Sequence, residues 1–439
     1  MPINYGSTRV NDVFYGNKRV LQIYHGSNLV YNAEIGLPKG YVELEYIEAT
    51  NGQYIDTGVL YNNVAKAKVE AKMVSYEGSG YPTILGCATL SPLAYGVMIG
   101  VGPNGFYEQT GSGGQGYIYH SYPFDLNKHT FITDTINKTM TIDDTMDTYE
   151  HDKSSINLNV YLLRRNINGD TLGSACMCRC YSCKLWNNDD KLIANMIPAM
   201  RTSDGKIGMY DLHRRKFLTN ADTGEFIAGN FVLPKGYDEL EYIESTGTQY
   251  IDTLYKPNNN TKFYINYNVT GAAGSSVANV PYGVTNISPN VDKAGNGLFR
   301  TISGSSSFNR VAWGDETIGS NSNNSLSSHA IVYGQWVSDY YDQNEIYIDN
   351  DLVYTSTTNP LTVWNSTNNL YIFARNNQGH VDFNSAMKLK LAYVTENNLY
   401  KMYLKPARKI SDGTVGMYDL INNKFLTNAG TGDFIIPTN

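Results

Sequence analysis

The sequence predicts an all-β protein in which two copies of one sandwich-sized module follow a short β-repeat. The first observation is a duplication: residues 37–57 (LPKGYVELEYIEATNGQYIDT) and 233–253 (LPKGYDELEYIESTGTQYIDT) are identical at 17 of 21 positions. The second is that residues 203–227 match residues 411–435 at 18 of 25 positions. The third is the local pattern, because short alternating segments bounded by Gly, Asn and Asp dominate and helical periodicity is scarce.

The spacing of the two copies indicates a common scaffold with a variable middle. The second copy begins 196 residues after the first (233 against 37), but its closing segment lies 208 residues further on (411 against 203). The second copy has therefore gained 12 residues in its middle, as expected for a scaffold with variable loops. A duplicated module favours binding by repetition over a single catalytic centre, because two linked weak sites gain avidity.

Residues 1–36 carry a repeat of their own. Gly6, Gly16 and Gly26 are ten residues apart, in the units YGSTRV, YGNKRV and HGSNLV. Each unit predicts a short strand and a Gly-containing turn. A segment this small cannot bury a core alone, so it must pair with its own copies, the next domain or a larger assembly. We expect an anchor, with a β-meander packed on the first module as the alternative. The attachment candidates are Val10, Phe14, Val20, Tyr24 and Val30.

The chain therefore divides into an N-terminal β-repeat anchor at 1–36, a first sandwich at 37–232 and a second at 233–439. The segment GEFIAGNFVLPKGY between the sandwiches offers barely any linker, so we expect the modules to sit close together. Inside each module, NVYLLRRNINGD at 159–170 matches NLYIFARNNQGH at 369–380 as an alternating strand. The closing hairpin reads GMYDL…KFLTNA in both copies, with Asp-Leu and Asn-Ala at positions that suit tight turns.

Composition excludes several classes of function. The formal net charge is −7, which argues against nucleic-acid binding. No run of 18 apolar residues is present, so we expect no membrane insertion, and the start MPINYGSTRV lacks the apolar stretch of a secretory signal. Tyrosine occurs 36 times and charged residues make up only 17%, which predicts a polar, β-prone surface.

The cysteines predict a strand. Cys87 stands alone, and the others occur in CMCRCYSC as Cys176, Cys178, Cys180 and Cys183. The first three of this run alternate, so they share one face of a strand. Zinc sites usually take ligand pairs from two separate turns, and no second cluster exists. We expect small reduced core residues, since the matching MKLKLAYV at 387–394 has no cysteine.

Three segments resemble a known family. LEYIESTGTQYIDT, LYIFARNN.G and GMYDL..NKFLTNAGTG.F resemble the tandem concanavalin A-like, laminin-G-like jelly-roll modules found in phage virion proteins and in surface proteins of gut bacteria. The N-terminal repeat is similar to segments that begin phage head-fibre, tail-fibre and capsid-decoration proteins. The resemblance implies two antiparallel sheets packed face to face, with carbohydrate recognition as the usual task. The ligand stays open, because this fold hosts lectins, glycanases and structural modules.

On this fold, ELEYIE at Glu43–Glu48 and Glu239–Glu244 is one residue away from the E-x-D-x-x-E motif of laminarinase-like glycosidases. Three observations oppose catalysis: the central residue is Glu45 or Glu241 instead of Asp, the segment opens the module, and it occurs in both copies among scaffold residues. We interpret it as a first strand with exposed Glu alternating against core Leu44, Tyr46 and Ile47. We expect no enzymatic activity and assign no catalytic residue.

Two further sets of residues suit a scaffold role. Asp143 and Asp349 could bind calcium, but no second acidic loop supplies the remaining oxygens, so a turn role is favoured and no cofactor or metal site is expected. His129 and His329 fall at what we interpret as matched strand starts.

Aromatic residues in segments that do not match between the copies are the candidates for glycan binding, because sugar rings stack on aromatic faces. They are Tyr117, Tyr119 and Tyr122 in the first copy and Trp313 and Trp336 in the second.

We expect a phage virion appendage, assembled in the host cytoplasm, that is attached to other virion proteins by residues 1–36 and adheres weakly to host-surface or mucus glycans. A homo-oligomer is expected, with a trimer as the state typical of fibres, although no heptad pattern argues for it. The alternatives are a purely structural capsid or fibre protein without glycan binding and a bacterial cell-surface adhesin.

Overall fold

The computed structural model describes residues 36–437 except 51, 77–79, 91, 113–117, 170–174, 272–278, 286–296, 303–309, 315, 319–332, 343–344 and 356–364. It describes the backbone alone at 112, 297, 299, 301, 310–314 and 316–318, and in six short strands before residue 36. Within these residues every regular element is a β-strand, apart from one 3-10 turn at Tyr61–Asn63, so the all-β prediction is confirmed. Among them no helix is long and apolar enough to cross a membrane.

The N-terminal repeat forms three separate hairpins instead of the single strand per unit that we predicted. Each ten-residue unit contributes two paired strands: β1 (Asn4–Tyr5) with β2 (Thr8–Arg9), β3 (Val13–Tyr15) with β4 (Lys18–Val20), and β5 (Gln22–His25) with β6 (Asn28–Asn32).

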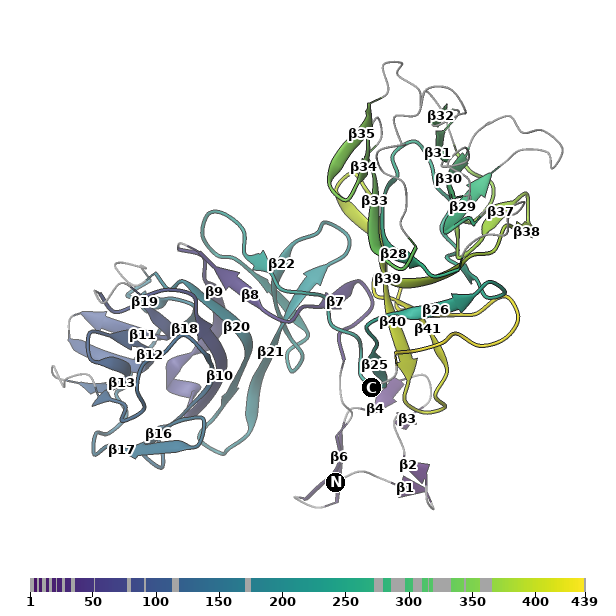
Figure 1. Ribbon diagram of the computed structural model, residues 1–439. Helices are drawn as coiled ribbons and strands as arrows, with labels where there is room; N and C mark the ends of the chain where they lie inside the picture. Colours follow the sequence, from purple (N-terminus) through teal and green to yellow (C-terminus); the bar gives the residue numbers. More distant parts are fainter. Residues whose placement is uncertain are drawn as a thin grey trace. The chain divides into compact units, whose positions relative to one another are not determined.

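The chain then divides into two compact units, residues 1–201 with 206–232 and residues 202–205 with 233–439 (Figure 1). In the first unit the larger sheet has the order β17-β16-β15-β10-β20-β21-β22-β23, with β7, β8 and β24 paired at its side. The second sheet has the order β14-β13-β12-β11-β18-β9, with β19 on β11. Their bounds are β7 Tyr41–Glu43, β8 Ile47–Ala49, β9 Ile55–Leu60, β10 Lys66–Met73, β11 Thr83–Leu90, β12 Leu93–Gly102, β13 Gly105–Ser112, β14 Ile118–Tyr119, β15 Lys128–Asp134, β16 Thr139–Ile142, β17 Thr145–Thr148, β18 Asn159–Leu162, β19 Arg165–Ile167, β20 Cys178–Trp186, β21 Leu192–Arg201, β22 Ile207–Asp211, β23 Lys216–Thr219 and β24 Ile227–Ala228.

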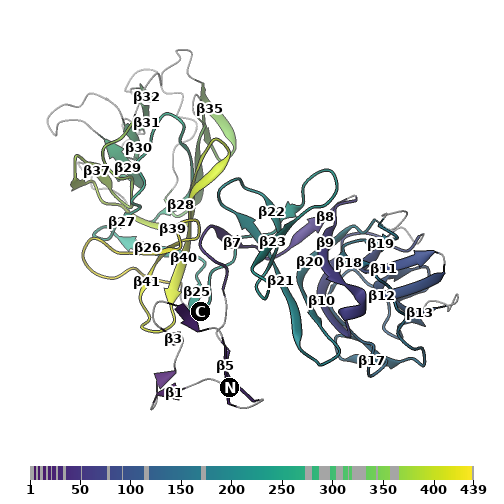
Figure 2. The ribbon, with the colours of Figure 1, turned by 180° about the vertical axis from the view of Figure 1, so that it is seen from behind.

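The second unit repeats this plan. Its larger sheet has the order β35-β34-β33-β28-β39-β40-β41-β42, with β25 and β26 at its side. A sheet of order β27-β36-β29-β37-β38 and a three-stranded sheet β30-β31-β32 complete the unit (Figure 2). Their bounds are β25 Tyr237–Glu239, β26 Ile243–Thr246, β27 Ile251–Asp252, β28 Lys262–Val269, β29 Tyr282–Thr285, β30 Gly297–Thr301, β31 Arg310–Gly314, β32 Glu316–Ile318, β33 Trp336–Asp342, β34 Glu345–Ile348, β35 Asp351–Thr355, β36 Tyr371–Ile372, β37 Arg375–Asn377, β38 His380–Asp382, β39 Ala386–Glu396, β40 Leu399–Lys409, β41 Val415–Asp419 and β42 Lys424–Thr427.

In each unit the core lies between the two sheets. Phe263 on β28 contacts Tyr282 on β29 at 5.1 Å, and Phe106 on β13 contacts Phe131 on β15 at 5.2 Å between ring centroids. Residues on the larger sheets alternate between buried and half-buried along β10 and β28, as expected when one face of a strand packs on a core. The predicted pair of tandem sandwiches is therefore what the chain forms.

The cysteine prediction is confirmed except for Cys176, which lies before the strand and not on it. All five cysteines are free and buried, and Cys178, Cys180 and Cys183 lie on β20. The run departs from strict alternation because a bulge opposite Glu70/Ala71 leaves Tyr181 unpaired, so Cys180 and Cys183 both face the core. The second unit has its bulge at the equivalent place, Asn266/Tyr267, where Leu389 and Ala392 fill the same positions.

The strand registers locate the extra residues and correct one pairing. His129 lies opposite Ala71 beside the first bulge, and Val337 lies opposite Tyr267 beside the second. Val337, which is 208 residues after His129, is thus its counterpart. The pairing of His129 with His329 was wrong, because the 12 additional residues precede β33 and His329 lies outside the described residues.

The single strand predicted for ELEYIE is also wrong. The segment is broken into β7 and β8, because Leu44 leaves the sheet register in an isolated bridge with Phe231. Leu44 and Ile47 are buried as predicted, but Tyr46 is half-buried and faces away from the core, and Glu48, predicted to be exposed, is buried.

The closing hairpin is held by a buried aspartate in each unit. Asp211, fully buried, accepts hydrogen bonds from the backbone N–H groups of Asn195, His213 and Arg214 at 3.1, 2.9 and 3.1 Å. Asp419 accepts from the N–H groups of Tyr403, Ile421 and Asn422 at 3.2, 3.1 and 3.3 Å. The predicted tight turns at Asp-Leu are therefore present, and each carboxylate also joins the turn to the neighbouring strand.

We predict that Asp211→Ala destabilises the first unit by roughly 2–4 kcal/mol, because it leaves three backbone donors and Arg214 without their acceptor. Urea unfolding of the full chain would measure the loss. Asp189→Ala, in an exposed turn of the same unit, is the control and should change stability by no more than about 0.5 kcal/mol. Equal effects of the two substitutions would contradict the assigned role.

Candidate functional site

The first-unit glycan candidates do not form an open aromatic surface. Tyr117 lies outside the described residues. Tyr119 on β14 is half-buried with its ring edge-on to Tyr107, 6.4 Å away. The Tyr122 ring packs against His129 at 5.1 Å. Tyr119 and Tyr122 therefore complete the packing around the connection from β13 to β15.

A hydrogen-bonded network of one histidine and two aspartates lies beside this connection. The buried His129 ring lies between two carboxylates, with Nε2 at 2.7 Å from Asp125 and Nδ1 at 2.8 Å from Asp143. Asp143 also accepts a hydrogen bond from the Thr130 N–H at 2.9 Å and has a positive φ of 52°. In the second unit Asp349, with a φ of 51°, accepts from the Ser338 N–H at 2.8 Å. Both aspartates thus serve the turn, and no group of three or more metal-ligating side chains occurs among the described residues.

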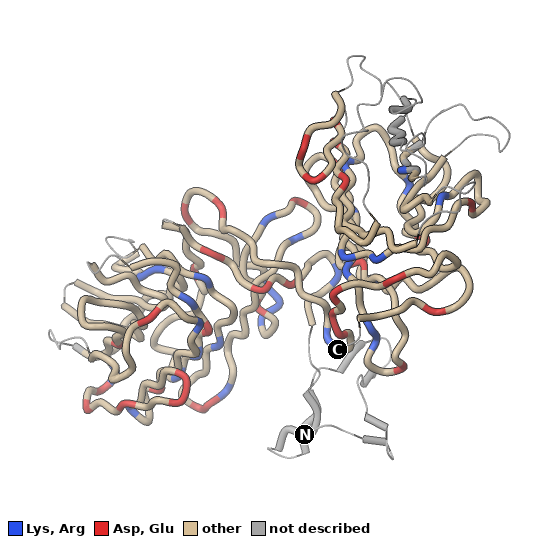
Figure 3. Tube along the Cα trace, viewed as in Figure 1, with Lys and Arg blue, Asp and Glu red and all other residues tan. Residues whose placement is uncertain are grey.

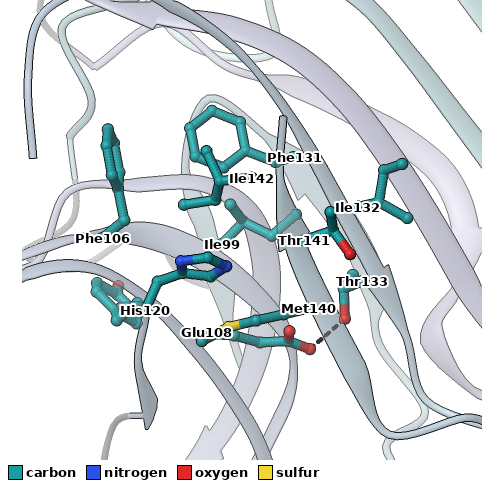
Figure 4. A pocket seen from close by; sticks show the side chains of 11 residues that line it. Ile99, Phe106, Glu108, His120, Phe131, Ile132, Thr133, Met140, Thr141 and Ile142 are labelled. Atoms are coloured by element: carbon teal, nitrogen blue, oxygen red, sulfur yellow. Dashed lines mark hydrogen bonds between the residues drawn. The ribbon is translucent and has the colours of Figure 1, made fainter. Parts of the chain in front are cut away.

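A small cavity lies behind this connection (Figure 4). Glu108 on β13 and His120 point into it, between Phe106 and the side chains of β15 and β16. The Thr133 hydroxyl donates to Glu108 Oε1. Among the described residues, neither Glu108 Oε2 nor His120 Nε2 has a hydrogen-bond partner, although both are buried. The cavity measures about 20 Å³, which suits a water molecule and not a sugar ring.

The second unit buries charge at the matching place. Arg300 on β30 is fully buried, and the carboxylate of Asp339 accepts from the hydroxyls of Tyr267 and Tyr282 at 2.9 and 2.7 Å. Burial alone would lower the pKa of Arg300, but the Asp339 charge and the surrounding tyrosines raise it. By strand register Asp339 occupies the place of Phe131. This position lines the cavity in the first unit, whereas in the second unit it holds a buried acid.

Trp336, a predicted glycan candidate, lies on the outer face of the larger sheet of the second unit. Its ring lies 6.1 Å from that of Tyr242, and the Lys390 ammonium lies 4.2 Å from its centroid. Lys388 lies 4.5 Å from the Tyr242 ring. We call Tyr242, Trp336, Lys388 and Lys390 the second-unit quartet. For Trp313, only the backbone of β31 is described.

The first unit has a quartet of the same kind, two aromatic rings with a cation over each, but one ring and its cation have exchanged strands. Arg179 lies 4.4 Å from the Tyr46 ring, Lys128 lies 4.2 Å from the Tyr181 ring, and the two rings are 5.5 Å apart. By strand register Lys128 is the counterpart of Trp336, so the aromatic and the cation have changed strands. Because a cation lies over every ring, the faces of these rings are partly covered.

The largest aromatic feature of the outer face was missed by the sequence analysis. One tyrosine on each of five adjacent strands lies directly opposite the next, and all five are half-buried. We call this row the tyrosine ladder, and in order across the sheet it consists of Tyr347, Tyr340, Tyr264, Tyr393 and Tyr403. Figure 1 shows the strands that carry it, β34, β33, β28, β39 and β40, in the second unit, where they are neighbours in the larger sheet.

The rings of the ladder overlap only in part. Tyr264 and Tyr393 are stacked with centroids 4.8 Å apart, and Tyr393 and Tyr403 with centroids 5.8 Å apart and planes inclined by only 6°. Parallel rings in contact lie about 3.5–4 Å apart, so these longer separations mean that each ring is offset from the next. Each of these three stacked rings therefore leaves part of its face uncovered by the next ring of the row, and Tyr400 packs edge-on to Tyr393 and Tyr403 at 5.6 and 5.5 Å.

The ladder belongs to the second unit alone. The matching row of the first unit, read from the same registers, is Thr141, Ile132, Lys68, Lys184 and Asn195. A signal was present in the sequence: KFYIN, SDYYD, EIYID, LAYVT and KMYLK each place a tyrosine at an outward position. Only the strand order joins these five positions into one row.

The glutamates of ELEYIE are engaged in ion pairs. In the second unit Lys405, Lys390 and Lys388 lie 2.7, 3.2 and 3.9 Å from Glu239, Glu241 and Glu244 respectively. In the first unit Glu48 pairs with Arg179 at 2.6 Å. At least four of the six glutamates therefore contact a basic residue, each a different one, which fits the scaffold interpretation.

The attachment candidates fall in the N-terminal hairpins. Phe14, Val20, Tyr24 and Val30 lie on β3, β4, β5 and β6, where the backbone alone is described, and Val10 lies outside the described residues.

Comparison with known proteins gives a similarity to solved structures alone. No family model and no curated protein matches the chain. Among solved structures, the domains LG4-5 of the mouse laminin alpha1 chain are similar with 12% sequence identity and a TM-score of 0.27. That match covers 85% of this chain and 94% of the other. A TM-score this low carries no argument about the sites described above.

We predict that the stability of the first unit falls as the pH rises, because of Glu108. Burial raises the pKa of Glu108 from 4.5 to about 8 in the folded chain, although the Thr133 hydroxyl opposes the shift. The folded state therefore favours the protonated acid. The stabilisation is complete below about pH 4.5 and is lost as the pH rises through 8, by roughly 3–5 kcal/mol.

Glu108→Gln should flatten this dependence, since the amide keeps the shape and cannot ionise. Urea unfolding of the full chain at several pH values between 4.5 and 9 would test this. The exposed Glu225→Gln is the matched control. An unchanged pH profile in the Glu108 variant would refute the assignment.

Proposed function

We propose that this chain is an adhesion protein whose second sandwich binds carbohydrate on the outer face of its larger sheet. The observation that carries the proposal is the tyrosine ladder, a row of offset, half-buried rings on five adjacent strands. Sugars present flat C–H faces that stack on aromatic faces, and half-buried rings provide such faces at a low entropic cost.

The surroundings of the ladder suit the hydroxyl groups of a sugar. Asn266 and Ser338 lie opposite each other on β28 and β33, two residues from the ladder on the same face. Trp336 lies two residues beyond Ser338, which extends the aromatic surface by about 13 Å along the strand from Tyr340. Stacking faces and short polar side chains thus occur on one continuous surface, as at other sugar-binding sites.

We propose a more specific role for the whole chain from its sequence. Residues 1–36, similar to the start of phage fibre and decoration proteins, would attach it to a virion, and the sandwiches would present the ladder to host-surface or mucus glycans. Several copies in one oligomer would turn weak binding into strong adhesion. Mass spectrometry of purified particles would detect the chain, and its absence from them would defeat this part of the proposal.

Two rivals make different predictions. A purely structural fibre protein would have no affinity for glycans and would bury large apolar interfaces between copies. A bacterial cell-surface adhesin would bind glycans but would not copurify with particles. Enzymatic activity is not proposed, and a reducing-sugar assay on β-glucans would expose it.

The ladder is tested by Tyr264→Ala combined with Tyr393→Ala, which removes its two central rings. We expect retention of the full chain on immobilised host polysaccharide to weaken roughly tenfold or more, since each stacked ring contributes about 0.5–1.5 kcal/mol.

The matched control is Lys68→Ala combined with Lys184→Ala, at the equivalent positions of the first unit, which should leave retention unchanged. Thermal unfolding would verify that both variants fold. Unaltered retention in the folded tyrosine variant would show that the binding surface lies elsewhere.

A further inference from the structure

We infer that the tyrosine ladder binds the interior of an extended, uncharged polysaccharide chain that runs across the strands, and not the end of a glycan. This inference rests on the proposed function and adds the class of ligand and its direction. Three features of the described residues support it: the length of the row, its straightness and the charge balance around it.

The row is long enough for several successive sugar rings. Four steps between adjacent strands, at about 4.8 Å each, give the five tyrosines a span of about 19 Å. On β35, the position opposite Tyr347 is occupied by Leu352, which is 52% exposed. This leucine extends the apolar row to a sixth strand, and an apolar residue so exposed at the end of an aromatic row fits a ligand that continues past the tyrosines.

The row is straight. All five side chains leave the sheet at the same register level, so they form a line perpendicular to the strands. The two stacked pairs are nearly parallel, with inclinations of 14° and 6°, and the planes of Tyr340 and Tyr347 are inclined by 39°. Recognition of a chain end requires side chains that converge around it, whereas rings in a line offer a similar contact to each successive unit of a polymer.

The charges around the ladder are balanced. Lys262 on β28 pairs with Asp342 at 2.9 Å, and Lys388, Lys390 and Lys405 pair with the glutamates of ELEYIE as described above. Figure 3 shows basic and acidic residues interspersed along this sheet instead of gathered by sign. A sulfated or carboxylated glycan would have to compete with these pairs, so an uncharged chain is the better fit.

The ladder hydroxyls at one end are also engaged within the unit. Tyr347 donates to Glu345, and Tyr340 donates to Asp342 at 3.4 Å. These bonds fix the ring orientations before a ligand arrives, which lowers the entropic cost of binding. The remaining occupant to consider is a second copy of the chain, packed ladder against ladder.

The test uses the full chain and four soluble, linear, neutral polysaccharides (mixed-linkage β-glucan, galactomannan, dextran and xyloglucan), with heparin as the acidic polymer. Affinity electrophoresis identifies the polymers that bind, and competition with size-graded oligosaccharides of a bound polymer measures the dependence on length. We expect a neutral polymer to bind, affinity to rise with chain length, monosaccharide not to compete, and a change from 50 to 500 mM salt to alter affinity less than twofold.

Shortening the ladder provides the second arm. Tyr347→Ser and Tyr403→Ser should each weaken binding of long chains about fivefold and leave short oligosaccharides unaffected, because only long ligands reach the ends. Thr141→Ser and Asn195→Ser, at the matching positions of the first unit, are the controls.

Three outcomes would overturn the inference in distinguishable ways. If a mono- or disaccharide competes as well as the polymer, or if heparin alone binds and salt abolishes it, the inference fails while the proposed function stands. If no polysaccharide binds and the Tyr264→Ala, Tyr393→Ala variant sediments as a smaller species than the unmodified chain, the ladder joins copies of the chain and both fail.

Discussion

Each sandwich depends on the buried carboxylate at its closing hairpin. Asp211 and Asp419 each collect three backbone N–H groups, two from their own turn and one from the adjacent long strand. A charged acceptor buried without these donors would cost several kcal/mol, so the turn and the strand must form together. In the second unit the donor from the strand is the N–H of Tyr403, a member of the tyrosine ladder. The constraint that closes the fold therefore also fixes one end of the candidate binding surface.

The two units show what such a scaffold allows to vary. The bulge, the turn aspartates and the closing carboxylate occur in both, whereas the position of Phe131 in one core holds Asp339 in the other. The first unit tolerates an acid beside a small cavity, and the second satisfies its buried acid with tyrosine hydroxyls near Arg300. The two cores thus hold different buried polar groups, and in each of them some buried polar atoms have no hydrogen-bond partner among the described residues. The backbone hydrogen bonds that define the fold do not depend on which solution is present.

The sequence predicted the features that both copies share better than the features in which they differ. Features held by backbone hydrogen bonds recur as identical letters in both copies, so the tandem sandwiches and the tight turns were predicted correctly, and the alternation of the cysteines predicted their strand. Pairing His129 with His329 failed because a shared letter was taken as a shared position, while the register assigns Val337. Tyr46 was assigned to the core because the break between β7 and β8 has no marker in the local pattern. The ladder was missed because the search for aromatics was confined to segments that differ in length, whereas its rings lie on strands that both copies share.

The exchange between the quartets explains how such a surface can change without loss of the fold. In the first unit the cation is Lys128 on β15 and the ring is Tyr181 on β20. In the second unit the ring is Trp336 on β33 and the cation is Lys390 on β39, so the two kinds of residue have exchanged strands. The attraction between a cation and a ring is the same whichever strand carries the cation. Such a pair on the outer face can therefore be kept when its two residues exchange strands. The outer face of a duplicated sheet is therefore the part that is freest to diverge. Lysines at Lys68 and Lys184 leave one copy with a charged face, and tyrosines at Tyr264 and Tyr393 give the other a continuous row of rings. Because the core residues on alternate positions are untouched by these changes, a binding surface can arise on one copy at little cost to the stability of either.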